Sequence, residues 1–236
     1  MTRLCLTVEG FTEQEFALTL LRPHLAGIEN PVQLNKPRLA SLGKRKQRVH
    51  RGGVVSYEAV KNDICRWLKE DDNPDVRFST MFDLYGLPSG FPGHAEAAEK
   101  ATAGQRVAAL EEAFEKDIND SRFIAYIQLH EFEALLLAEP SAFGPYFRDS
   151  EPAIEKAIER IAAFCERYDT PELIDDGVQT APSKRIIAEI PQYKSAKRTA
   201  GPIVAAEIGL DTMRKKCPHF NEWLSRLEQL GIDLEQ

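Results

Sequence analysis

A chain of 236 residues with 43% hydrophobic and 28% charged residues has the composition of an ordinary globular protein. No apolar run approaches the roughly 20 residues that cross a bilayer, and no secretory signal pattern opens the chain. We therefore expect no membrane association. The four cysteines are widely separated, which is typical of thiols in a reducing compartment, so we expect a cytoplasmic protein.

The net charge of −7 is unevenly distributed. The segment from Asn30 to Tyr57 has no acidic residue and holds seven of the 30 Lys and Arg residues, so the other 23 stand against all 37 acidic residues. A concentrated basic segment on an acidic protein indicates either contact with a polyanion or a solvated loop. The nucleic-acid-binding candidates in this segment are Lys44, Arg45, Lys46, Arg48 and Arg51.

The chain opens with a strand, a turn and a helix. Residues 3–8 form a short apolar run that ends before Gly10, as a buried strand does. Thr12 and Glu15 have the spacing of a capping box, which predicts a helix over residues 12–25.

Strands and helices then alternate up to about residue 140. We expect helices over 54–68 and from 95 or 104 to 116, and strands over 76–82 and 122–129. Such alternation predicts an α/β fold with a parallel-sheet core flanked by helices. After residue 139 only helical patterns follow, at 151–168, 183–190, 201–208 and 219–230. The expected domains are an α/β catalytic core over 1–140 and a helical C-terminal subdomain over 141–236.

Acidic residues follow each of the three expected strands. Glu9 follows the first, Asp83 the second, and Glu131 and Glu133 the third. Ligands of a parallel sheet gather beyond the carboxyl ends of its strands, and carboxylates that converge there are tolerated mainly around a cation. Oxygen ligands without a His or Cys set predict Mg²⁺ or Mn²⁺, which would assist the hydrolysis of a phosphodiester.

The segment Val8–Glu13 resembles the first motif of Toprim domains, in which an acid follows the first strand. Five segments in order resemble the family grouped as DUF4276, over nearly the whole chain: residues 8–16, 83–88, 128–136, 182–185 and 209–224. The resemblance implies a Toprim-like fold and a metal-dependent nuclease. Defence-associated members resemble the nuclease subunit of the phage-anti-restriction-induced system, which cuts tRNA beside an ATPase. This chain has no ATPase motif, so any ATPase would be a separate subunit.

The usual second Toprim motif is Asp-x-Asp, and here it is Asp83-Leu84-Tyr85. Glu131 or Glu133 would replace the lost carboxylate. If this stretch is helical, only one of the two can face the site, since positions two apart diverge by roughly 200°. If Glu131 lies in extended backbone, both can. The metal ligands expected are Glu9, Asp83, Glu131 and Glu133, and the catalytic residues are Glu9, Asp83, Glu133 and Lys184.

Cations that could hold phosphates also occur in the C-terminal part. Lys184 follows Pro182 at an expected helix start, where backbone N–H groups favour an anion. Lys194, Lys197 and Arg198 form a second basic group and are predicted to bind nucleic acid. The alternative interpretation is that these residues are ordinary solvated cations of the protein surface.

Two other functions remain open. The absent second Asp is compatible with a weakly active or inactive Toprim-like interaction module that a separate ATPase regulates. A phosphatase or nucleotidyl transferase could use the same carboxylates. RNA or DNA as substrate, and a homodimer as the assembly, are equally left open by the sequence.

Overall fold

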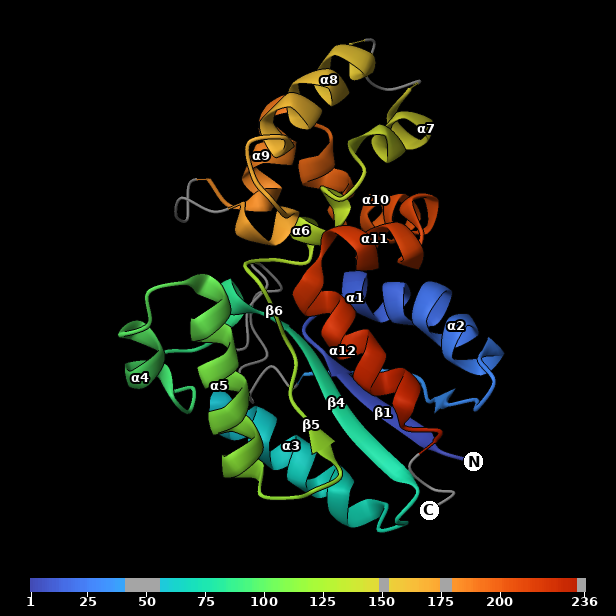
Figure 1. Ribbon diagram of the computed structural model, residues 1–236, viewed down its shortest axis with the longest axis vertical. Helices are drawn as coiled ribbons and strands as arrows, with labels where there is room; N and C mark the ends of the chain where they lie inside the picture. The colour runs from blue at the N-terminus through green and yellow to red at the C-terminus, as the bar shows by residue number, and fades with distance from the viewer. Residues whose placement is uncertain (41–55, 149–152, 175–179, 233–236) are drawn as a thin grey trace. The chain divides into compact units, whose positions relative to one another are not determined.

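The computed structural model describes residues 1–40, 56–148, 153–174 and 180–232 (Figure 1). The chain divides into two compact units. The first contains residues 1–128 and 225–236, and the second contains residues 129–224. The sequence-based division placed the boundary at residue 140.

Six parallel strands form the sheet of the first unit, which confirms the predicted α/β class. The two long strands β1 (Arg3–Val8) and β4 (Val76–Asp83) pair along the whole of β1. Short strands β2 (Gln33–Leu34) and β3 (Arg38–Leu39) pair with β1 on its other side. Strands β5 (Phe123–Ile124) and β6 (Ile127–Gln128) pair with the outer side of β4.

The strand expected over 122–129 is divided because a side chain replaces part of the ladder. The Thr80 hydroxyl accepts the N–H of Tyr126 and donates to its carbonyl, both at 3.0 Å. Glu111 and Glu115 accept the backbone N–H groups of the two residues that flank Tyr126, at 2.8 and 3.0 Å. The edge strand is thereby satisfied by side chains as well as by its neighbour.

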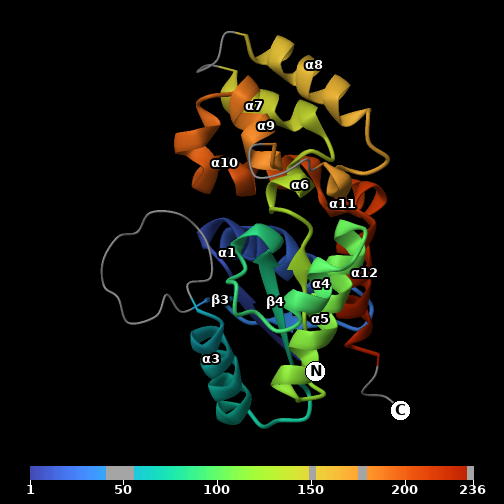
Figure 2. The ribbon, with the colours of Figure 1, turned by 90° about the vertical axis from the view of Figure 1, so that its left-hand side faces the viewer.

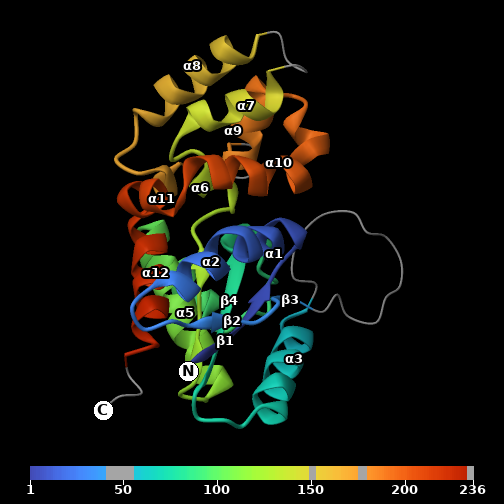
Figure 3. The same ribbon diagram turned by 90° about the vertical axis from the view of Figure 1, so that its right-hand side faces the viewer.

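Helices cover both faces of this sheet (Figures 2 and 3). The helices of the first unit are α1 (Phe11–Phe16), a π-helical turn (Ala17–Leu21), α2 (Arg22–Gly27), α3 (Tyr57–Glu70), a 3₁₀ turn (Leu84–Gly86), α4 (His94–Ala98) and α5 (Ala103–Ile118). On one face, Phe78 and Phe82 of β4 pack against Trp67 of α3 and Phe114 of α5, with ring centroids 5.7 and 6.4 Å apart. Helices α1 and α2 lie on the opposite face, as right-handed connections to strands on the two sides of β1 require.

The first helix begins differently from its prediction. It begins at Phe11 with Gly10 as its N-cap and has no side-chain cap, so the predicted capping box is wrong. The helix continues through the π turn into α2, where Pro23 occupies the second position. The wider turn accommodates Pro23, which lacks an N–H and would clash with the carbonyl four residues earlier in a regular α-helix.

In the second unit, no strand occurs among the described residues, as predicted for the C-terminal part. Its helices are α6 (Glu133–Leu136), a 3₁₀ turn (Pro140–Ala142), α7 (Phe143–Phe147), α8 (Ile154–Cys165), a 3₁₀ turn (Pro171–Leu173), α9 (Pro182–Glu189), α10 (Tyr193–Ile208), α11 (Leu210–Lys216) and most of α12 (Pro218–Gln229). Helix α10 begins eight residues before the predicted start and carries Pro202 in its interior, so Gly201-Pro202 does not begin a helix.

One buried acid of the second unit has a structural role. Glu172 is 2% exposed, and its two carboxylate oxygens accept the N–H groups of His219 and Phe220 at 2.9 and 3.0 Å. These groups belong to the first turn of α12, where four N–H groups lack partners within the helix. Burial raises the pKa of Glu172, and the two hydrogen bonds oppose that rise. No described helix of either unit meets the length and apolarity needed to cross a membrane.

Candidate functional site

The order in which strands are added to the sheet of the first unit reverses between β1 and β4. The chain leaves β1 towards β2 on one side and later returns to pair β4 on the other side. In an open parallel sheet this is the switch point, and ligands bind beyond the carboxyl ends of the two strands there. Glu9 follows β1 directly, and Asp83 is the last residue of β4. Two of the predicted acids therefore lie at the position that the topology favours for a ligand.

The Glu9 carboxylate accepts a hydrogen bond from a backbone N–H group. Its Oε2 accepts the backbone N–H of Asp83 at 3.1 Å, while the backbone N–H of Glu9 continues the ladder to Met81 O at 3.2 Å. Glu9 and Asp83 are both half-buried. A carboxylate that accepts a fixed N–H loses rotational freedom, so Glu9 is preorganised.

Gly86 allows the Glu9 carboxylate to occupy this position. A Cβ atom on Gly86 would overlap the Glu9 carboxylate, since it would lie 2.8 Å from the Glu9 Cδ. Gly86 ends the 3₁₀ turn that follows Asp83. No local sequence pattern connects Gly86 to Glu9, because the two residues are 77 positions apart and meet only in the tertiary structure.

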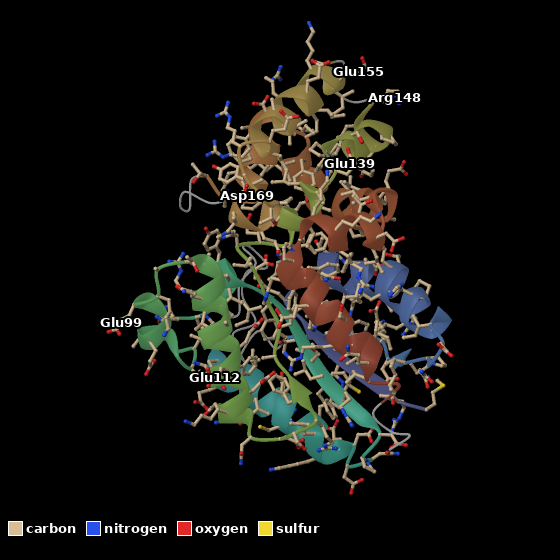
Figure 4. All side chains as sticks on the ribbon, in the orientation of Figure 1. Glu99, Glu112, Glu139, Arg148, Glu155 and Asp169 are labelled. Atoms are coloured by element: carbon tan, nitrogen blue, oxygen red, sulfur yellow. The ribbon has the colours of Figure 1, made fainter. Side chains whose placement is uncertain are left out.

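Two neighbouring residues complete the description of this end of the sheet. Glu13 is 8% exposed in the first turn of α1, and a Cβ on Gly10 would lie 2.9 Å from its Oε2. Tyr85, two residues after Asp83, is 38% exposed. By contrast, Glu99, which directly follows α4, and Glu112 on α5 are exposed acids (Figure 4). Within the described parts of the chain, no three His, Cys, Asp or Glu side chains group closely enough to hold a metal ion.

Replacing Gly86 by Ala is expected to displace the Glu9 carboxylate while leaving the fold intact. For a metal-dependent activity, we expect the Mg²⁺ concentration at half-maximal rate to rise about 10-fold or more, as for other changes that misorient a ligand. Gly90→Ala is the matched control, since Gly90 lies in the same loop and its added Cβ meets nothing within 4 Å. Equal metal dependence in the two variants would show that Gly86 does not position Glu9.

Glu131 and Glu133 lie in the second unit and have different environments. Glu131 Oε2 accepts the N–H of Ser183 at 2.9 Å, in the first turn of α9, where the helix dipole favours a negative charge. Glu133 is 1% exposed; its Oε1 accepts the hydroxyl of Tyr193 and pairs with Lys197 Nζ, each at 3.0 Å. The Glu133 Oε2 has no hydrogen-bond partner among the described atoms.

Burial raises the pKa of Glu133, the positive charge of Lys197 lowers it, and the neighbouring Glu131 raises it again. A carboxylate this deeply buried is costly unless it is paired. The sequence pattern could not reveal the pair, because Glu133 and Lys197 are 64 positions apart. Neighbouring His130 is buried and has a left-handed φ of 64°.

The predicted cations have varied positions. Lys184 is exposed on the first turn of α9, and Lys194 and Arg198 are exposed on α10. Lys197 extends inward to Glu133, although 41% of its side chain is exposed. The other five candidates lie outside the described residues: Lys44, Arg45, Lys46, Arg48 and Arg51. The structure thus brings together Glu9 with Asp83 in the first unit, and Glu133 with Lys197 in the second.

Comparison with known proteins identifies the family of the chain through one family model. No curated protein and no solved structure matches the chain. The family model described as "Domain of unknown function (DUF4276)" matches residues 8–228, which include Glu9, Asp83, Glu131 and Glu133. The match covers far more than half of the sequence, and the chain therefore belongs to the DUF4276 family.

Proposed function

We propose that the chain is a Mg²⁺- or Mn²⁺-dependent nuclease of the Toprim type, in which Glu9 and Asp83 hold the ion and act on a nucleic-acid phosphodiester. One observation carries this proposal. The two carboxylates lie at the switch point of a parallel sheet, and one of them is fixed by a backbone N–H and a glycine contact. Buried structural acids such as Glu172 also accept backbone N–H groups, so the position of Glu9 and Asp83 beyond the carboxyl ends of β1 and β4 is what favours a ligand site.

The donor set fits a hard divalent cation. Mg²⁺ takes oxygen ligands, keeps several waters, and is commonly bound by one or two carboxylates together with substrate phosphates. Two carboxylates at the switch point therefore suffice, although no three His, Cys, Asp or Glu side chains of the described residues group closely enough to hold a metal ion. A bound ion would polarise the phosphate oxygens and make a coordinated water more acidic.

The chain's own residues have distinct roles in this proposal. The Asp83 N–H orients the Glu9 carboxylate, and Gly86 leaves room for it. Glu9 is then placed to accept a proton from an attacking water, and Asp83 to bind the cation. Glu131 and Glu133 are not required, because Glu131 bonds the first turn of α9 and Glu133 is paired with Lys197.

The basic segment from Asn30 to Tyr57, which contains no acidic residue, supports a nucleic-acid substrate. Lys36 and Arg38 belong to it and are exposed on the first unit. Contacts through phosphates predict that binding weakens steeply with salt. By resemblance, tRNA is the first substrate to test, and a separate ATPase subunit and a cytoplasmic role in defence against phage belong to the same proposal.

A second candidate function is an inactive interaction module regulated by an ATPase. Two observations favour it: Tyr85 occupies the place of the second Asp, and the described residues offer no third ligand beside Glu9 and Asp83. Metal binding separates the two functions, because only the nuclease requires it.

The discriminating experiment is thermal unfolding in 10 mM Mg²⁺ or Mn²⁺. For a dissociation constant on the order of 1 mM, binding adds about 1.4 kcal/mol of stability, which is a rise of about 3–6 °C in Tm. We expect this rise in the wild type and in Glu112→Ala, and its loss in Glu9→Ala and Asp83→Ala. A shift that survives in Glu9→Ala would assign the ion to another site.

A further inference from the structure

The first unit contains a cavity whose lining does not include Glu9 or Asp83. It has a volume of about 620 Å³ and is lined by α3 and by the residues around β3. Sites for small organic ligands span roughly 300–1,000 Å³, so the cavity is large enough for one. Thr7 of β1 also lines it, two residues before Glu9.

The wall of this cavity contains a flat cationic surface. The Arg38 guanidinium lies over the Trp67 ring, with its Cζ 3.9 Å from the ring centroid. Glu70 Oε2 lies 3.3 Å from Arg38 Nη1 and fixes the guanidinium from its edge. Trp67 is 7% exposed, whereas the Arg38 side chain is 53% exposed. The inner face of the guanidinium therefore covers the ring, and its outer face is available to a ligand.

Charges around this surface suit a nucleotide. Lys36 and Arg66 line the cavity and are exposed cations that can approach a phosphate. Asp63 also lines the cavity, and its Oδ1 lies 3.6 Å from Arg66 Nη1. The Asp63 carboxylate can also accept a hydrogen bond from a base amino or ring N–H group. Flat guanidinium surfaces stack with unpaired bases, and stacking of this kind tolerates any base because every base has a π-face.

We propose that this cavity binds an unpaired nucleobase of a single-stranded nucleic acid, stacked on the outer face of Arg38 with its phosphates near Lys36 and Arg66. This deepens the nuclease function proposed above and rests on it for the identity of the ligand class. A strand advances about 3.3 Å per residue, so Thr7 lies about 7 Å along β1 from Glu9. A base held here would position the adjoining strand relative to the acids at the switch point.

The alternative role for Arg38 is internal, as a link between β3 and α3 through Trp67 and Glu70. The two roles predict different results for Arg38→Lys, which keeps the charge and loses the planar surface. A purely internal role predicts lower stability and unchanged binding. A stacking role predicts weaker binding of single strands with an unchanged salt dependence, because the number of cations is the same.

The test is fluorescence anisotropy with labelled ten-nucleotide RNA and DNA single strands and a ten-base-pair duplex. It is carried out in EDTA on the Glu9→Gln background, so that no cleavage is required. We expect Arg38→Lys to bind single strands about 10-fold more weakly, because the unpaired base loses its flat stacking surface, and to bind the duplex unchanged. Arg106→Lys is the matched control, since it makes the same substitution on α5 at a half-buried arginine that does not line the cavity; we expect its affinity to change less than 2-fold.

A second measurement follows the base locally. The chain has two tryptophans, so Trp223→Phe leaves Trp67 as the single emitter. We expect saturable quenching of Trp67 by single strands and none by the duplex. Unchanged binding in Arg38→Lys would overturn the base site even if the protein cleaves nucleic acid. Selective loss of single-strand binding in Arg38→Lys would support it even if cleavage is never found. Comparing the affinities for the RNA and DNA single strands shows whether the site prefers ribose or deoxyribose.

Discussion

Glu9→Gln is expected to lower the rate of Mg²⁺-dependent phosphodiester cleavage by about 1,000-fold, within the 10²–10⁴ range for loss of a proton-transfer group. The substitution keeps the shape of the side chain and an oxygen that can accept the Asp83 N–H. It removes the negative charge that attracts the cation and the basic oxygen that takes a proton. The measurement is a single-turnover cleavage rate with end-labelled tRNA at saturating Mg²⁺.

Glu15→Gln is the matched control because Glu15 is an exposed acid on the same N-terminal helix. Its rate should stay within 2-fold of the wild type, and the Tm of both variants should remain within about 2 °C. A Glu9→Gln rate within 5-fold of the wild type would remove Glu9 from catalysis and favour the interaction module.

Lys197→Met is expected to destabilise the protein by on the order of 2 kcal/mol at neutral pH. The typical cost of removing one partner of a buried pair is about 3–5 kcal/mol, reduced here because Lys197 is 41% exposed. The change leaves the Glu133 carboxylate buried, with Tyr193 as its remaining donor. Urea unfolding measures the difference, and Lys194→Met on the exposed surface of the same helix is the control.

The cost of Lys197→Met should depend on pH with a definite sign. Burial raises the pKa of Glu133 in the folded protein, and loss of the Lys197 charge raises it further. A group with a raised folded pKa contributes stability that is present below its unfolded pKa, about 4.3, and is lost as pH rises through the folded value. The difference between wild type and variant should therefore shrink towards pH 4 and grow towards pH 8. An equal difference at both values would mean that the charge of Glu133 is not involved.

The position of Glu9 and Asp83 followed from the sequence for a simple reason. Each acid ends an apolar run, and strands joined by helical connections lie parallel with their carboxyl ends at one edge. The neighbouring positions of β1 and β4 in the sheet needed the structure, but the common edge did not. This explains why the α/β class could be predicted from local patterns alone.

Other features depend on contacts that no local pattern contains. Thr80 divides the third predicted strand by bonding Tyr126, which is 46 positions away. The capping-box spacing of Thr12 and Glu15 was present, yet Gly10 provides the N-cap because the chain turns directly after Glu9. Lys197 was predicted to bind phosphates as one of several surface cations, and only its approach to Glu133 distinguishes it from them.

The most direct test of the proposed nuclease is cleavage of a panel of tRNA, single-stranded DNA and duplex DNA by the purified protein. Reactions with Mg²⁺, with Mn²⁺ and with EDTA are compared for the wild type and Glu9→Gln. The proposed function predicts cleavage of at least one substrate by the wild type with metal, and none with EDTA or with Glu9→Gln. Cleavage that persists in EDTA or in Glu9→Gln, or no cleavage of any substrate, would contradict it.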